Sequence, residues 1–91
     1  MTTAITHDMV GHKFTTTVDG HEGFVEYDSG DGRIVITHTV VPAEIGGRGI
    51  AGELVKAAFD FARSEGLKVV PECSYAAGYL QKHPEYANLA A

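Results

Sequence analysis

The sequence has one cysteine, no tryptophan, three prolines and no long apolar run. A single cysteine, Cys73, cannot form an internal disulfide, and the first residues show neither a basic start nor an apolar stretch. We therefore expect a cytoplasmic protein without a signal or transit peptide. No apolar segment approaches the roughly 20 residues that a membrane-spanning helix needs, so we expect no membrane partner.

Positive charge is scarce as well. Seven Lys and Arg stand against twelve Asp and Glu, which gives a formal net charge of -5. A nucleic-acid surface needs clustered cations, and these seven are dispersed, so we expect no nucleic-acid partner. An anionic small ligand stays compatible with this charge, because backbone N–H groups bind phosphate without a net positive charge.

Metal-binding patterns are also missing. His7, His12 and His21 have no partner at metal-ligand spacing, and one cysteine cannot complete a zinc site. We therefore expect no metal. The length of 91 residues and the hydrophobic content of 44% predict one soluble globular domain over residues 1–91. We expect that domain to be a monomer or a weak dimer.

The first half of the chain reads as an antiparallel meander. Residues 12–18 and 21–27 are strand-like, and Asp19-Gly20 between them is the signature of a two-residue type I′ hairpin. Residues 28–32 form a polar turn. Residues 33–41 are β-branched almost throughout and predict the strongest strand.

After Pro42 the apolar period becomes helical. Residues 49–65 predict an amphipathic helix that ends at Gly66, and residues 67–70 predict a short strand. A second helix is expected over residues 74–82, ended by His83-Pro84. The order β-β-β-α-β-α predicts an α+β fold, in which an antiparallel meander is followed by a right-handed β-α-β crossover with parallel strands and a C-terminal helix.

The stretch "GGRGIAG" (residues 46–52) opens the first helix. Its Gly47, Gly49 and Gly52 match the dinucleotide pattern G-x-G-x-x-G, but four residues separate them from the strand, and the chain holds only one β-α-β unit. The stretch is not a Walker A loop, because no Lys-Ser or Lys-Thr follows the glycines. Four glycines at a helix N-terminus indicate backbone N–H groups kept free for an anion, and Gly52 costs ~1 kcal/mol relative to Ala inside a helix unless something approaches it closely.

This stretch resembles the pyrophosphate-binding motif of the GCN5-related N-acetyltransferases, R/Q-x-x-G-x-G/A, which falls on Gly46, Gly49 and Ala51. "VPAE", "GRGIAGELV", "VVPECSY" and "HPEY" together resemble the small YjdJ-type acetyltransferase-like family of about ninety residues. The resemblance covers the chain from the meander to "HPEY". Gly46 departs from the motif, which has Arg or Gln there, and this removes a side-chain contact to the phosphates.

The resemblance implies a compact GNAT-like fold that binds acetyl-CoA as co-substrate. It implies that the strands 33–41 and 67–70 separate at their C-terminal ends, that the pantetheine arm enters between them, and that Pro71 cannot close the separation. The implied acetyl-CoA-binding residues are Val40, Val41, Gly46, Gly47, Arg48, Gly49, Ile50, Ala51 and Gly52.

Four residues are candidates for catalysis. Cys73 lies before a helix, where a helix N-terminus favours the thiolate of a nucleophilic cysteine, although burial as a small hydrophobic residue is an equal alternative. His38 is expected on the face of Ile34, Ile36 and Val40, as a base for Cys73 or for an amine. Tyr75 and Tyr79 are candidates to protonate the departing CoA thiolate, with aromatic packing as the alternative for each.

The expected function is acetyl-CoA-dependent N-acetyl transfer to an unidentified amine. The alternative is a CoA- or acyl-CoA-binding module with little or no transferase activity, because the chain has no room for the N-terminal helices that build an acceptor pocket in larger members of the superfamily. A third alternative is a small interaction domain in which the glycines only shape a turn.

Overall fold

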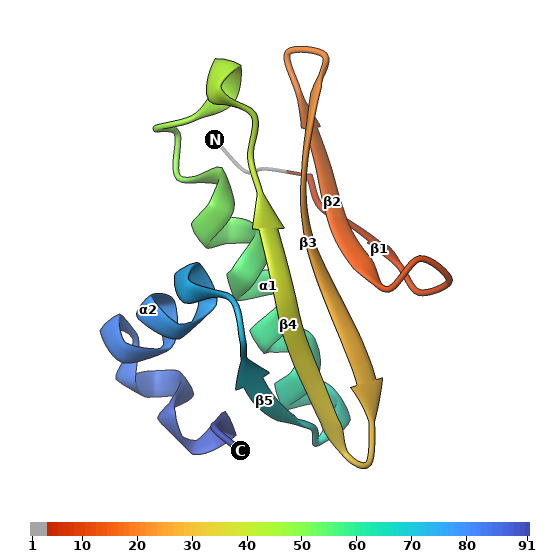
Figure 1. Cartoon of the computed structure of the whole chain (residues 1–91), viewed down its shortest axis with the longest axis vertical. Coiled ribbons are helices and arrows are strands. Elements are labelled where there is room, and N and C mark those ends of the chain that lie inside the picture. The colour runs from red at the N-terminus through yellow and green to blue at the C-terminus, as the bar shows by residue number, and fades with distance from the viewer. Residues whose placement is uncertain (1–3) are drawn as a thin grey trace.

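Five strands form one sheet in the order β1-β2-β3-β4-β5 (Figure 1). The computed structural model describes residues 4–91. The strands are β1 (Thr6–Asp8), β2 (Lys13–Val18), β3 (His21–Gly30), β4 (Arg33–Val40) and β5 (Lys68–Pro71). The helices are α1 (Ile50–Glu65) and α2 (Ser74–Lys82), with short 3-10 helices η1 (Ala43–Ile45) and η2 (Pro84–Leu89). The predicted α+β order is confirmed, with one strand more than expected.

Two parts of the meander differ from the prediction. β1 was not expected, and it pairs antiparallel with β2 through His7 and Phe14. β3 runs to Gly30 instead of residue 27, because Asp31-Gly32 is a second two-residue turn with positive φ at both positions. The predicted turn at Asp19-Gly20 is confirmed, with φ values of 50° and 79°.

Among the five described strands, only β4 and β5 pair in parallel, and Ala90 adds an isolated parallel bridge to Val69 of β5. The β4–β5 pairing runs from Arg33 opposite Lys68 to Ile36 opposite Pro71. At that point the N–H groups of Glu72 and Cys73 both bond the carbonyl of Ile36, each at 3.0 Å, and the chain turns away into α2 (Figure 1). β4 continues to Val40 without β5 beside it, so the expected separation of the two strands is confirmed.

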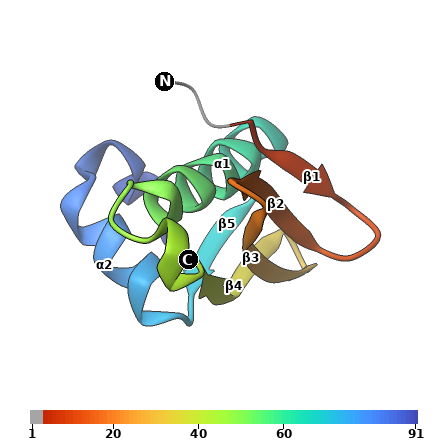
Figure 2. The same ribbon diagram turned by 90° about the horizontal axis from the view of Figure 1, so that it is seen from above.

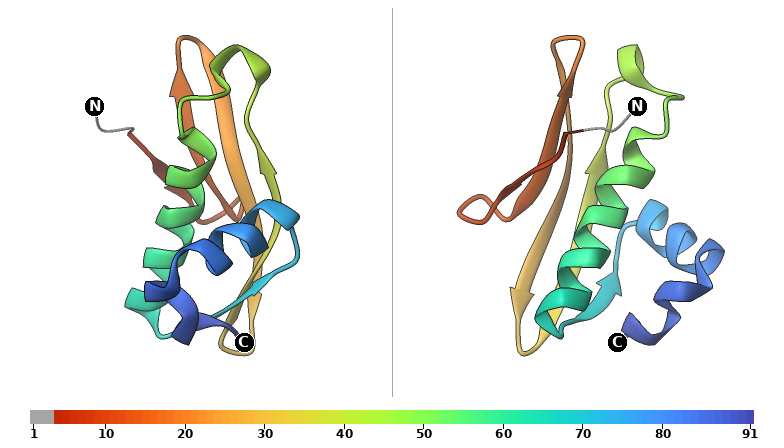
Figure 3. Two further views of the ribbon diagram at one scale, coloured as in Figure 1. Left: turned by 90° about the vertical axis from the view of Figure 1, so that its left-hand side faces the viewer. Right: turned by 180° about the vertical axis from the view of Figure 1, so that it is seen from behind.

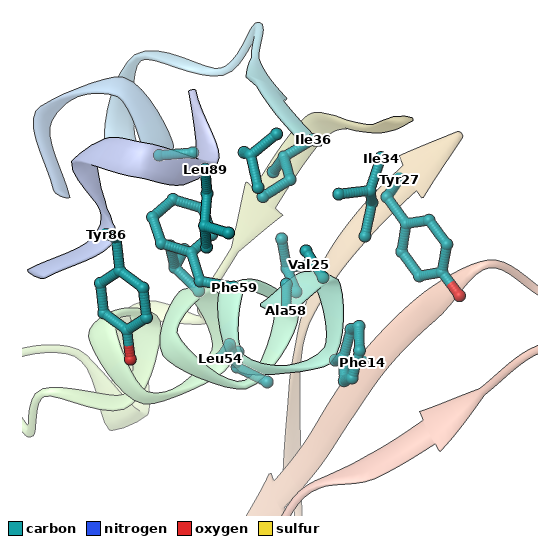
Figure 4. Packing of buried hydrophobic residues seen from close by; sticks show 14 of the residues in the cluster. Phe14, Val25, Tyr27, Ile34, Ile36, Leu54, Ala58, Phe59, Tyr86 and Leu89 are labelled. Atoms are coloured by element: carbon teal, nitrogen blue, oxygen red, sulfur yellow. The ribbon is translucent and has the colours of Figure 1, made fainter. Parts of the chain in front are cut away.

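Helix α1 covers one face of the sheet. Its buried residues Leu54, Val55, Ala58, Phe59 and Ala62 lie at helical spacing and pack on the inward residues of the strands (Figure 4). Figure 2 shows α1 across the sheet and α2 to the side of β5. Gly49 and Gly66, both with positive φ, bound α1 as its N-cap and C-cap, in agreement with the predicted limits of this helix.

The opposite face of the sheet carries no helix within residues 4–91 (Figure 2). Its side chains include the exposed Glu22, Asp28, His38 and Val40. The single parallel pair and the antiparallel meander also rule out a doubly wound dinucleotide-binding domain, which stacks several parallel units. In the described part of the chain, no helix has both the length and the apolar character needed to cross a bilayer.

An aromatic cluster packs between the β1 edge of the sheet and α1. The imidazole of His7 stacks on Phe14 with centroids 4.0 Å apart, meets the edge of Phe61 at 4.5 Å, and hydrogen-bonds the hydroxyl of Tyr27 through Nε2. Burial lowers the pKa of His7 below its ordinary value, and the nearby Asp8 carboxylate opposes this only in part. The folded protein therefore favours the neutral imidazole.

We expect stability to fall as the pH drops below 6.5, the ordinary pKa of histidine. The unfolded chain then binds a proton that folded His7 resists, so the contribution present above pH 6.5 is lost as the pH falls through the lowered pKa. His7→Phe keeps the aromatic stacking, and its free energy of unfolding should fall less steeply between about pH 7.5 and about pH 5. That free energy should also be lower at every pH, because the hydroxyl of Tyr27 loses its hydrogen-bond partner. Urea denaturation over this pH range measures the free energy of unfolding, and the same pH dependence in His7→Phe and in the unmodified protein would contradict this role of His7.

Candidate active site

The loop between η1 and α1 presents a row of backbone donors. Gly47 and Gly49 have φ of 78° and 75°, a conformation that suits glycine, and Gly49 caps α1 without a side-chain hydrogen bond. Within the described residues, no amide from position 47 to position 52 donates a hydrogen bond, and the first one back into α1 is from Glu53 to the carbonyl of Gly49. We name residues 46–52 the cradle. Figure 3 shows it at one end of the molecule, beyond the end of β4.

A cavity of about 260 Å³ opens at the cradle. Its lining consists of Val41, Ile45, Gly46, Gly47, Gly49, Ile50, Ala51 and Tyr75. Six of the nine residues predicted to bind acetyl-CoA therefore line one cavity, together with Tyr75 from α2. The free N–H groups and the positive end of the α1 dipole make this cavity suitable for an anion.

The other three predicted binding residues lie around this cavity. Val40 ends β4 and is 44% exposed. The guanidinium of Arg48 pairs with the carboxylate of Asp19, in the β2–β3 turn, at 2.7 Å. Both side chains are exposed, so this ion pair contributes little and can be exchanged for a ligand anion.

Gly52 lies under the side chains of α2. A Cβ at this position would stand 3.3 Å from the hydroxyl of Tyr75 and 3.7 Å from the ring of Tyr79. The sequence predicts that some group approaches Gly52 closely. That group is the side chain of Tyr75, which packs α2 against the first turn of α1. The same contact holds Tyr75 at the cradle.

A β-bulge in β4 decides which side chains face α1. Glu26 pairs with His38 and Tyr27 pairs with Ile36, so Thr37 has no partner on β3. At Thr37 the regular alternation of side chains between the two faces of the sheet is therefore interrupted. The expectation that His38 shares a face with Ile34 and Ile36 is wrong, whereas the expectation that it shares a face with Val40 agrees with the pairing. His38 shares the face of Glu26, which carries no helix, and it is exposed.

The residue that the bulge turns toward α2 is Thr39. It pairs with the fully buried Val25, and its hydroxyl lies 3.3 Å from Sγ of Cys73. Cys73 is the N-cap of α2, and Sγ also accepts from the N–H of Ala76 at 3.4 Å. Either group can donate in the contact between Thr39 and Cys73, and a Cys73 thiolate would accept from both the Thr39 hydroxyl and the Ala76 N–H. The sequence analysis missed Thr39, because a β-branched strand carries no signal of an unpaired residue.

Cys73 lies close to the cradle cavity. Thr39 and Cys73 touch each other, and each is two residues from a residue of the cavity lining, Val41 or Tyr75. The cysteine therefore lies where β4 and β5 have separated, on the side of the sheet that faces the helices. It is partly exposed.

The two candidate tyrosines differ in their surroundings. Tyr75 is 44% exposed and lines the cradle cavity. Tyr79 packs edge-on against Phe59 and stacks on His83 with centroids 3.8 Å apart, and burial raises its pKa. Only Tyr75 therefore presents its hydroxyl at the cradle, whereas Tyr79 lies in the packing between α2 and its neighbours.

Comparison with known proteins agrees with this geometry. Residues 13–89 match the model of a family described as GCN5-related N-acetyltransferase. The chain belongs to the GCN5-related N-acetyltransferase family. No group of three or more His, Cys, Asp or Glu within residues 4–91 could hold a metal ion.

Several proteins are similar over most of their length. The chain is 40% identical to protein NATD1 of Gallus gallus over 83 residues, which are 88% of this chain and 76% of that protein. NATD1 of Homo sapiens is also 40% identical, over 88% of this chain and 74% of its own length. A candidate GCN5-like N-acetyltransferase of Staphylococcus aureus, solved by NMR, superposes with a TM-score of 0.75 at 30% identity, covering 97% of this chain and 87% of the other.

The contact between Thr39 and Cys73 can be tested without any substrate. Thr39→Val keeps the shape of the side chain and removes the hydroxyl. We expect alkylation of Cys73 by iodoacetamide to slow on the order of tenfold, because a hydrogen bond to a charged group contributes ~1.5 kcal/mol. The rate is measured by mass spectrometry of the intact protein.

Thr37→Val is the matched control, since it makes the same change two residues away, where the hydroxyl bonds the carbonyl of Glu26 instead. This variant should react at the rate of the unmodified protein. If Thr39→Val also reacts at that rate, the hydroxyl does not stabilise the thiolate and Cys73 is a packing residue.

Proposed function

We propose that the protein takes the acetyl group of acetyl-CoA onto Cys73 and passes it to an amine. The observation that carries this proposal is the place of Cys73. Its sulfur accepts from the N–H of Ala76 and contacts the hydroxyl of Thr39 where β4 and β5 separate, near a cavity lined by free backbone N–H groups. Membership of an acetyltransferase family supports the same chemistry.

Binding of acetyl-CoA would use the cradle for the diphosphate. Gly46 supplies no side-chain contact to phosphate where the family motif has Arg or Gln, so the N–H groups of residues 47–52 and the helix dipole carry the interaction. Beyond Ile36, β4 has no strand on the side of β5. Its backbone near Val40 and Val41 can therefore hydrogen-bond the amide groups of the pantetheine arm, as a further strand would.

The first half-reaction would form a thioester on the protein. The Cys73 thiolate attacks the carbonyl carbon of the acetyl group, the bond from that carbon to the sulfur of CoA breaks, and the electron pair leaves on that sulfur. Tyr75 is the candidate to protonate the departing thiolate, since it is partly exposed and follows Cys73 by two residues at the start of α2. Thr39 and Ala76 hold Cys73 in place before and after transfer.

The second half-reaction would proceed from the face of the sheet without helices. An amine attacks the carbonyl carbon of acetyl-Cys73, the bond to Sγ breaks, the thiolate is restored, and the amine loses a proton. His38 is exposed on this face beside Glu26, one residue from Thr39. We assign to His38 the base for the incoming amine and not for Cys73, because the bulge turns it away from the sulfur.

A second candidate function is a CoA- or acyl-CoA-binding module without transfer. The open face of the sheet favours it, because within residues 4–91 no element encloses a site for the acceptor. Transfer in two separate half-reactions does not require an enclosed acceptor site, because an acyl-enzyme does not need both substrates bound at the same time. The two functions differ in whether an amine causes release of CoA from acetyl-CoA.

Acetyl-CoA alone should therefore add one acetyl group to the protein. We expect the adduct on Cys73, and Cys73→Ser should remove it without weakening binding of CoA, because the cradle lies elsewhere. Mass spectrometry of the intact protein and of its peptides locates the group. Addition of a mixture of amines should then remove it.

His38→Gln separates the two steps. It should form the adduct as the unmodified protein does and lose it to amines more slowly, on the order of a hundredfold for the loss of a general base. Binding of CoA with neither an adduct nor amine-dependent release of CoA from acetyl-CoA would leave the binding module as the function. Unchanged transfer by Cys73→Ser would show that the acetyl group passes directly to the amine.

A further inference from the structure

A row of four titratable side chains crosses the face of the sheet that carries no helix. Asp8 on β1 pairs with Lys13 on β2, Lys13 pairs with Glu26 on β3, and Glu26 pairs with His38 on β4. Side chains that stand directly opposite each other share a face, with Cβ atoms ~5 Å apart. The row therefore ends with a carboxylate beside the imidazole of His38.

The β-bulge of β4 brings His38 into this row. If the pairing of Tyr27 with Ile36 continued without the bulge, Glu26 would stand opposite Thr37. His38 would then stand opposite Val25, whose side chain is fully buried. The bulge therefore keeps the imidazole out of the core and places it opposite the carboxylate of Glu26.

The side chains of Glu26 and His38 are not engaged elsewhere. Within residues 4–91, neither forms an ion pair, and the hydrogen bond that Thr37 donates to Glu26 ends on the main-chain carbonyl. Lys13, on the other side of Glu26, holds its ammonium over the ring of Phe24, 5.5 Å from the ring centroid. The carboxylate of Glu26 is therefore available to His38.

A carboxylate in this place has a use in the second half-reaction. A proton passes from the nitrogen of the attacking amine to a ring nitrogen of His38, which becomes a cation and later releases the proton to water. A neighbouring carboxylate stabilises this cation as it forms. By accepting a hydrogen bond from one ring nitrogen, it also leaves the other ring nitrogen free to take the proton.

We infer that Glu26 is a positioning residue for His38, which it orients and stabilises as a cation while the amine attacks acetyl-Cys73. This inference rests on the proposed function, because it gives a partner to the base of the second half-reaction. Glu26 acts through the imidazole and contacts neither the acetyl group nor CoA. Its effect is therefore confined to the second half-reaction.

Glu26→Gln tests this role, because it removes the charge and keeps the size of the side chain. The protein is acetylated with acetyl-CoA, freed of CoA and mixed with n-butylamine, and loss of the acetyl group is followed by mass spectrometry of the intact protein. The maximal rate of loss should fall about fivefold, the effect of an opposite-charge pair across two strands, while formation of acetyl-Cys73 stays unchanged.

Glu22→Gln is the matched control. Glu22 lies on the same strand and the same face, but it stands opposite Thr17 on β2 and is four residues from Glu26. This variant should lose the acetyl group at the rate of the unmodified protein.

A double-mutant cycle with His38→Gln separates positioning from other roles. In the His38→Gln protein, Glu26→Gln should have no further effect, because the carboxylate acts through the imidazole. A carboxylate that only attracts the amine, or only supports the sheet, would slow both proteins by the same factor.

That equal slowing, or an unchanged rate in Glu26→Gln, would overturn Glu26 as a positioning residue and leave the proposed function standing. Absence of acetyl-Cys73 in the unmodified protein would overturn the proposed function and this inference with it.

Discussion

The end of the pairing between β4 and β5 is the constraint on which the site depends. Two N–H groups, from Glu72 and Cys73, converge on the carbonyl of Ile36 and turn the chain out of the sheet. β4 then runs on to Val40 with unpaired backbone on one side, and α2 begins at once with Cys73 as its N-cap. A continued parallel pair would satisfy that backbone internally and would move the cysteine into the sheet.

The bulge at Thr37 complements this separation. Because one residue of β4 has no partner, Thr39 turns toward α2 and His38 toward the face without helices. One side of the sheet then holds the sulfur and its hydrogen-bond partners, and the other side holds an exposed imidazole. This division suits a reaction in which one substrate occupies the cradle and the other approaches across the open sheet.

Much of the fold follows from the sequence, because its signals are local. The helical period and the flanking glycines define α1, Asp19-Gly20 defines the first hairpin turn, and His83-Pro84 ends α2. β1 carries too short a pattern to be seen, and the length of β3 depends on a second turn at Asp31-Gly32. The bulge depends on pairing between strands, so alternation along β4 alone assigns His38 to the wrong face and hides Thr39.

The central claim is that free amides of residues 47–52 hold the diphosphate of acetyl-CoA at the mouth of the strand separation. An NMR titration of the amide signals tests it most directly. Acetyl-CoA should shift the amides of Val41 and residues 47–52, and NAD should not. Gly49→Val should lose these shifts, whereas Gly66→Val, at the other end of α1 with a similar positive φ and open surroundings, should keep them. Equal shifts with NAD, or retained shifts in Gly49→Val, would contradict the account.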